Sequence, residues 1–108
     1  MKRLISFPIG TAGNKVIVGL DSIAAITFTT TSAMTIAYIG ATSTTFKVTI
    51  TFTTADTTYA SHNAVVKAIS DAFAIGAFSK ENLAVYELPT LPMVGATQQV
   101  LTSVAYAV

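Results

Sequence analysis

Apolar and polar side chains alternate without interruption over residues 46–53. In an extended chain, successive side chains point to opposite faces. The apolar set is Phe46, Val48, Ile50 and Phe52, and the polar set is Lys47, Thr49, Thr51 and Thr53. The pattern therefore predicts a strand with one buried and one exposed face. Parallel strands are usually apolar on both faces, so an antiparallel sheet with one solvent-facing side is favoured.

Six further segments are rich in β-branched or alternating apolar residues and are bounded by glycine, proline or polar residues. These predicted strands are residues 4–9, 15–20, 23–29, 34–39, 83–88 and 100–108. Toward the C-terminus, residues 89–97 contain Pro89, Pro92 and Gly95 and are predicted to form a long loop. Loops of that length often carry binding residues.

The hydrophobic period changes after residue 53. From Tyr59 to Phe73 apolar residues recur every three to four positions, which is typical of an amphipathic helix. Asp56 or Thr57 is suited to cap the first turn, and Gly76 is suited to end the helix in a left-handed conformation. We predict one helix over about residues 57–75.

The length of 108 residues suits one hydrophobic core. The strands and the helix together predict one α+β domain over residues 1–108. Its expected architecture is a mainly antiparallel sheet of about six to seven strands, with the single helix packed on it.

Only 10% of the residues are charged, against about 25% in a typical soluble domain. The six Lys and Arg residues are scattered, which disfavours a nucleic-acid partner. No segment approaches the roughly 20 apolar residues of a membrane-spanning helix, and the N-terminus lacks the apolar core of a signal peptide. We expect a soluble protein with no membrane partner. The chain has no cysteine, so disulfides and thiolate chemistry are excluded.

The sequence contains no recognisable catalytic or metal-binding set. His62 is the only histidine, and Asp56 and Asp71 lie about two helical turns from it in opposite directions. Residues that far apart on a helix do not form a pair, so a structural or surface role is favoured for His62. A metal site usually needs several His, Cys or acidic ligands together. We therefore expect no catalytic residues, no metal and no cofactor, and we lean toward a protein that is not an enzyme.

The low charge predicts that the protein associates with copies of itself. A neutral surface rich in hydroxyl groups is suited to lie against a symmetry-related copy. The predicted interface residues are threonines on two strands, namely Thr27, Thr29, Thr49, Thr51 and Thr53. We expect a structural or assembly protein that forms a homo-oligomer.

The chain as a whole is free of cysteine, poor in charge and rich in threonine and alanine. In these respects it resembles the small decoration or head-type proteins of tailed bacteriophages. The resemblance is one of composition and carries no residue motif, so no site residue follows from it. It implies a virion location, a trimer, and contacts with other virion proteins.

The alternative is a small-molecule binding domain or minimal enzyme. Its pocket would lie between the helix and the sheet, near Tyr38, Tyr59, His62 and Tyr86. Tyrosine and histidine are polar groups suited to orient a ligand in an otherwise apolar pocket.

Overall fold

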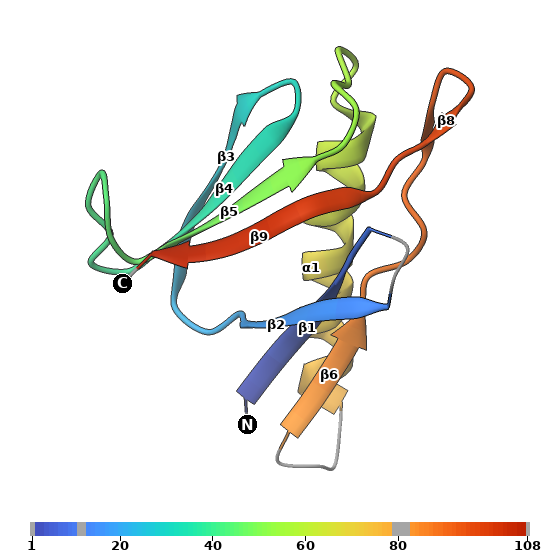
Figure 1. The fold of residues 1–108 in the computed structure, drawn as a ribbon. Helices are drawn as coiled ribbons and strands as arrows, with labels where there is room; N and C mark the ends of the chain where they lie inside the picture. Colours follow the sequence, from blue (N-terminus) through green and yellow to red (C-terminus); the bar gives the residue numbers. More distant parts are fainter. Residues whose placement is uncertain (1, 11–12, 79–82, 108) are drawn as a thin grey trace.

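The computed structural model describes residues 2–10, 13–78 and 83–107. Within them, one helix, α1 (Ala60–Phe78), packs against a seven-stranded sheet (Figure 1). The sheet consists of β1 (Lys2–Ile9), β2 (Asn14–Gly19), β3 (Ile23–Thr30), β4 (Ala33–Tyr38), β5 (Lys47–Phe52), β6 (Leu83–Glu87) and β9 (Leu101–Ala107). A separate two-stranded hairpin is formed by β7 (Met93–Val94) and β8 (Thr97–Gln98). The predicted α+β class is confirmed.

The strand order is β2-β1-β9-β5-β4-β3, and β6 also pairs with β1. The pairs β1–β2, β3–β4, β4–β5 and β5–β9 are antiparallel, whereas β1 is parallel to both β6 and β9. The sheet is thus mixed but mainly antiparallel, as predicted, with four antiparallel and two parallel pairs. A parallel pair requires a long crossover connection. The segment that contains α1 returns the chain so that β6 runs in the same direction as β1.

Strand β1 joins two parts of the sheet. Residues 2–6 pair with β6 along one edge, and residues 4–9 pair with β2 along the other. The end of β1 contacts β9 through the Ile9–Leu101 pair, and the amide of Gly10 donates to the carbonyl oxygen of Leu101 at 2.8 Å. Ile5, Ser6 and Phe7 are fully buried, so β1 is covered on both faces.

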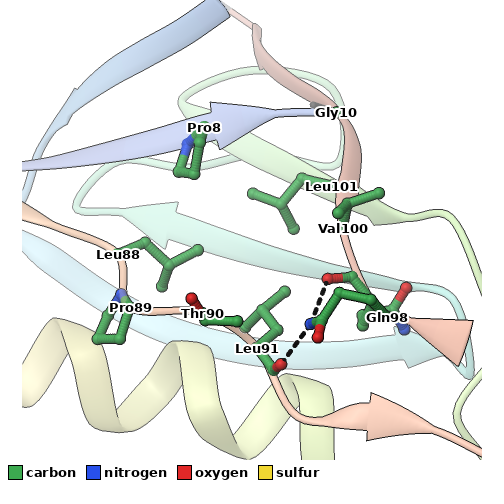
Figure 2. Close-up of a pocket in the computed structure, with 10 residues that line it drawn as sticks. Pro8, Gly10, Leu88, Pro89, Thr90, Leu91, Gln98, Val100 and Leu101 are labelled. Carbon is green, nitrogen blue, oxygen red and sulfur yellow. Dashed lines mark hydrogen bonds between the residues drawn. The ribbon is translucent and has the colours of Figure 1, made fainter. Parts of the chain in front are cut away.

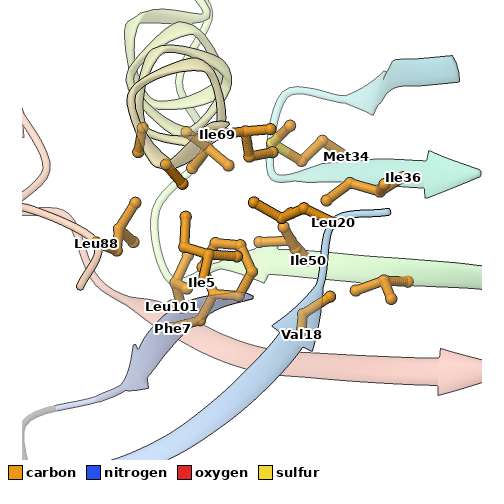
Figure 3. Packing of buried hydrophobic residues seen from close by; sticks show 14 of the residues in the cluster. Ile5, Phe7, Val18, Leu20, Met34, Ile36, Ile50, Ile69, Leu88 and Leu101 are labelled. Carbon is orange, nitrogen blue, oxygen red and sulfur yellow. The ribbon is translucent and has the colours of Figure 1, made fainter. Parts of the chain in front are cut away.

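The hydrophobic core lies between α1 and the two parts of the sheet (Figure 3). β1 contributes Ile5 and Phe7, and α1 contributes Val65 and Ile69. The other large members come from the remaining strands and their ends: Val18, Leu20, Met34, Ile36, Val48, Ile50, Phe52, Leu88, Leu91 and Leu101. The apolar face predicted for residues 46–53 is confirmed for Val48, Ile50 and Phe52, which are buried.

The helix lies about three residues further along the chain than predicted. The carboxylate of Asp56 accepts hydrogen bonds from the amides of Thr58 at 3.0 Å and Ser61 at 2.9 Å. Tyr59 has a φ of 58°, so residues 56–59 form a turn and α1 begins only at Ala60. Gly76, predicted as the cap, lies inside α1. A glycine inside a helix costs only about 1 kcal/mol relative to alanine, so packing overrides it.

All seven predicted strands are present, with ends within two residues for those inside the described ranges. The predicted loop over residues 89–97 contains β7 and most of the β7–β8 hairpin. Strands of two residues are too short to produce a hydrophobic period, so they could not be predicted from the pattern. In the part of the chain that the structure describes, no helix combines the length and the apolar character that crossing a bilayer requires.

Candidate functional site

One face of the sheet is built mainly from small, uncharged side chains. Across three strand boundaries Thr27 lies opposite Thr35, Thr35 opposite Thr49, and Thr49 opposite Ala105. We call this surface the threonine–alanine face; it comprises Ala25, Thr27, Ala33, Thr35, Ala37, Lys47, Thr49, Thr51, Ser103, Ala105 and Ala107. All of these residues are partly or fully exposed. The buried side chains of the same strands point to the other side, where α1 packs (Figure 3).

The threonine–alanine face has a single ionisable side chain, that of Lys47. The other members present only methyl and hydroxyl groups. Such a surface buries apolar methyl groups when it is covered and requires little removal of water from charges. Its chemistry therefore suits contact with another protein surface.

Strand β3 is the last strand of the sheet and forms the outer edge of this face. Its only strand neighbour among the described residues is β4. Its sequence, Ile-Ala-Ala-Ile-Thr-Phe-Thr-Thr, contains no charge and no proline, and six of its eight residues are exposed. Soluble proteins usually protect an edge strand with charges, proline or a covering segment, because unpaired backbone groups invite another strand. β3 lacks charge and proline over its full length.

The five predicted interface threonines are only partly brought together. Thr27, Thr49 and Thr51 lie on the threonine–alanine face. Thr29 is exposed on β3, within a shift in register between Thr27 and Thr30. Thr53 lies beyond the end of β5, where its amide donates to the carbonyl oxygen of Val100 at 2.9 Å.

Strands β3 and β5 are not neighbours, because β4 lies between them. Thr35 of β4 and Ala105 of β9 therefore complete the row that Thr27 and Thr49 begin. The alternation in residues 34–39 places Thr35 on the side opposite Met34, but strand order cannot be read from that alternation.

His62 is fully buried at the first turn of α1. Its Nε2 lies 2.9 Å from the carbonyl oxygen of Thr30 and 3.2 Å from that of Ala33. Both partners are acceptors, so Nε2 carries the proton and donates. The ring centroids of Phe52, Tyr59 and Phe28 lie 4.8, 4.9 and 5.0 Å from the imidazole. This arrangement holds the helix start against the β3–β4 turn.

A second polar cluster lies at the start of α1. The carboxylate of Asp56 accepts four hydrogen bonds from the amides and hydroxyls of Thr58 and Ser61. The Thr58 hydroxyl and then the Ser61 amide hold the pKa of Asp56 well below its usual range. Gln99 completes the cluster: its Nε2 donates to Ser61 Oγ at 3.1 Å and to the Thr54 carbonyl oxygen at 2.6 Å. The cluster is saturated internally and has a structural role.

The four residues of the alternative pocket lie in different environments. Tyr59 and His62 are in contact, whereas Tyr86 is half-buried on β6 opposite Ile5 of β1. Tyr38 lines a separate groove whose walls contain none of the other three. The phenol of Tyr38 donates to the carbonyl oxygen of Gly19 at 2.5 Å. Burial, assisted by Tyr106, raises the pKa of Tyr38 to about 12.

That groove lies between β2 on one side and β4, β5 and β9 on the other. Its volume is about 650 Å³. We call it the apolar groove; it is lined by Leu4, Val16, Ile17, Val18, Gly19, Asp21, Ser22, Tyr38, Ile39, Phe46, Val48, Val104 and Tyr106. It opens away from the threonine–alanine face, because Val48 and Val104 alternate with Thr49 and Ala105 along their strands.

A smaller cavity of about 160 Å³ lies where the end of β1 meets residues 88–91 and 98–101 (Figure 2). Gln98 crosses it, and its Nε2 donates to the carbonyl oxygens of Leu91 at 2.6 Å and of Gln99 at 3.2 Å (Figure 2). Ligand pockets usually measure roughly 300–1,000 Å³, so this cavity is too small for one. The described residues also contain no group of three His or acidic side chains placed to hold a metal ion.

The site is therefore defined by surface shape and by low charge: an α+β domain with a sheet face whose only ionisable side chain is that of Lys47, an edge strand without charge or proline, and an apolar groove. No protein-family model, no curated protein and no solved structure matches this chain.

Proposed function

We propose that this protein is a non-enzymatic structural module that assembles with copies of itself. The observation that carries the proposal is the uncharged edge strand β3, which forms the outer strand of a solvent-facing sheet surface whose only ionisable side chain is that of Lys47. An edge strand of this kind offers a row of backbone donors and acceptors to a neighbouring chain. The threonine–alanine face beside it adds methyl groups and hydroxyls to the contact.

The size of the face argues that the edge takes part. Four strands about 4.8 Å apart, each with about six residues of about 3.3 Å, span roughly 400 Å². A stable interface usually buries about 800 Å² on each partner. The face, with β3 counted as one of its four strands, is therefore too small by itself, so the contact must extend past the face, for which the outer backbone edge of β3 is our candidate.

We propose a trimer, which is the stoichiometry implied by the resemblance to phage decoration or head-type proteins. A contact between two identical surfaces closes as a dimer, so a trimer needs two different surfaces on each copy. β3 and the threonine–alanine face supply one surface. Strand β2, at the other end of the strand order, is our candidate for the second. A virion location and contacts with other virion proteins belong to the same proposal and rest on the compositional resemblance.

The test is the molar mass in solution, measured by light scattering and sedimentation from micromolar to near-millimolar concentration. The wild-type protein is expected to form a trimer. The double variant Thr27→Lys/Thr49→Lys adds two charges near Lys47, so the trimer is expected to dissociate by repulsion and by the cost of burying charge. The matched control is Thr97→Lys on the exposed strand β8, which should keep the wild-type mass.

Each outcome bears on the proposal. A wild-type protein that stays monomeric at every concentration contradicts self-assembly. A dimer supports self-assembly and excludes the trimer. Equal dissociation of the β8 control would show that added charge acts non-specifically and that β3 and its face are not the contact.

A further inference from the structure

The apolar groove combines a buried floor with exposed apolar residues at its rim. Val18 and Val48 form part of the floor and are buried in the core. At the rim the exposed fraction is 56% for Ile17, 73% for Ile39 and 56% for Tyr106. Single exposed apolar residues are common on proteins, but a group of them around a concave surface marks a binding site. The volume of about 650 Å³ lies within the range of small-molecule pockets.

The electrostatics of the groove select against charged ligands. Among the lining residues, Asp21 is the only one with a formal charge at neutral pH, and its Oδ1 lies 3.8 Å from the guanidinium of Arg3. No lysine or arginine lines the groove, so a carboxylate or phosphate would lose its water without gaining a cation. The phenol of Tyr38 is neutral at pH 7, and burial raises its pKa further, to about 12.

Two tyrosines are among the polar groups of the groove, together with Asp21 and Ser22. The Tyr38 and Tyr106 rings meet edge to face, with centroids 6.2 Å apart. The hydroxyl group of Tyr38 donates a hydrogen bond to the Gly19 carbonyl oxygen. The lone pairs of the phenolic oxygen are not used in that bond and can accept another hydrogen bond. A ligand with one hydroxyl group therefore finds an acceptor beside apolar walls.

We propose that the apolar groove binds an uncharged, lipid-like small molecule, with a hydrocarbon body against the walls from β2 and β9 and a hydroxyl group at Tyr38. This inference rests on the groove alone and is independent of self-assembly through β3. The groove and the threonine–alanine face lie on different sides of β5 and β9, and the two proposals share only strand β2, which lines the groove and is our candidate for the second contact surface. Failure of self-assembly therefore leaves the groove proposal standing.

The test uses the neutral fluorophore N-phenyl-1-naphthylamine with the full chain, at a concentration where the molar mass has been measured. Saturable fluorescence enhancement with one site per chain is expected. 1-Decanol should displace the fluorophore, whereas decanoate at the same concentration should not, because the groove contains no cation. Absence of saturable binding, or equal displacement by decanoate, overturns the proposal.

The variant Ile17→Ser removes an exposed wall of the groove and is expected to weaken fluorophore binding about five- to tenfold. The matched control is Val85→Ser, which removes a β-branched residue that is 45% exposed on β6, outside the groove. It should leave the affinity unchanged. Because both side chains are exposed, both variants are expected to fold, which circular dichroism checks.

Two results with these variants contradict the proposal. Equal weakening by Val85→Ser would show non-specific binding to exposed apolar surface. A change in molar mass with Ile17→Ser and no change in fluorophore affinity would assign the groove to a contact between copies of the chain.

Discussion

The Nε2 atom of His62 lies 2.9 Å from the carbonyl oxygen of Thr30, and this contact fastens the first turn of α1 to the β3–β4 turn. The same atom lies 3.2 Å from the carbonyl oxygen of Ala33, so one imidazole contacts the backbone on both sides of that turn. Because β3 is the outer strand of the threonine–alanine face, His62 also fixes the position of the proposed assembly surface relative to the core.

Replacing His62 by Phe keeps a ring within the aromatic cluster but removes the donor to Thr30 and Ala33. We expect a loss of about 1–2 kcal/mol in the free energy of unfolding, because two carbonyl groups lose their partner. The unpaired Nδ1 of His62 is removed at the same time, which limits the loss. Urea denaturation measures it. The control is Asn63→Ala, an exposed neighbour on α1, which should change stability by less than about 0.5 kcal/mol. An unchanged urea midpoint for His62→Phe would show that the two contacts contribute nothing.

Asp56 makes stability depend on pH on the acid side. Its pKa in the folded protein lies below the value of about 3.9 expected in the unfolded chain, so the unfolded state binds more protons in this range. Stability is therefore fully present above about pH 5 and falls as the pH decreases through 4 and below. Thermal unfolding across this range should show a smaller acid-side decrease for Asp56→Asn. Thr58→Val removes only the hydroxyl donor and should give an intermediate slope. Identical slopes for wild type and Asp56→Asn would refute this assignment.

Gln99 contacts Thr54 through both ends of its amide. Its Oε1 accepts from the Thr54 amide at 3.0 Å, and its Nε2 donates to the Thr54 carbonyl oxygen at 2.6 Å. Gln99→Glu replaces the donor with a carboxylate that faces the Thr54 carbonyl, so we expect a loss of about 2–4 kcal/mol in the free energy of unfolding. The matched control is Asn63→Asp, the same change from amide to carboxylate at an exposed position of α1, where the loss should be clearly smaller. Chemical denaturation compares the two, and equal losses would count against the role given to Gln99.

Tyr38 makes stability depend on pH on the alkaline side. Its pKa is about 12 in the folded protein and about 10 in the unfolded chain. The folded state therefore keeps the phenol proton to a higher pH than the unfolded state does. The free energy of unfolding decreases as the pH rises from 10 to 12. Tyrosinate absorbance should show a late step near pH 12 that disappears in Tyr38→Phe. Tyr86→Phe, the same substitution outside the groove, should leave this step in place. A late step that survives in Tyr38→Phe would belong to another tyrosine.

Much of the local structure was predictable because it depends on periods along the chain. The alternation at Val48, Ile50 and Phe52 identified β5 and its buried face, since extended chains place alternate residues on opposite sides. The apolar spacing from Tyr59 to Phe73 identified the helix. The start of α1 was less predictable, because the hydrogen bonds of Asp56 hold residues 56–59 in a turn that spacing does not reveal.

The candidate surfaces depended more strongly on tertiary structure. The low charge predicted an uncharged surface, but Thr35 joined Thr27 to Thr49 only because β4 is inserted between β3 and β5. Tyr38 is separated from His62 because it lines the apolar groove. That groove exists because β2 lies opposite β9 and forms its other wall. Neither strand order nor the course of β2 leaves a signal in the local pattern.

The sequence by itself determined which residues form strands, where the helix lies and how little charge the surface carries, because these properties are set by neighbouring residues and by composition. The tertiary structure alone decided that β1 runs parallel to β6, that His62 is enclosed by aromatic rings, and that an uncharged edge and an apolar groove lie on different sides of one sheet. These features arise from contacts between residues far apart in the chain, and their pairing is chosen by the packing of the whole core.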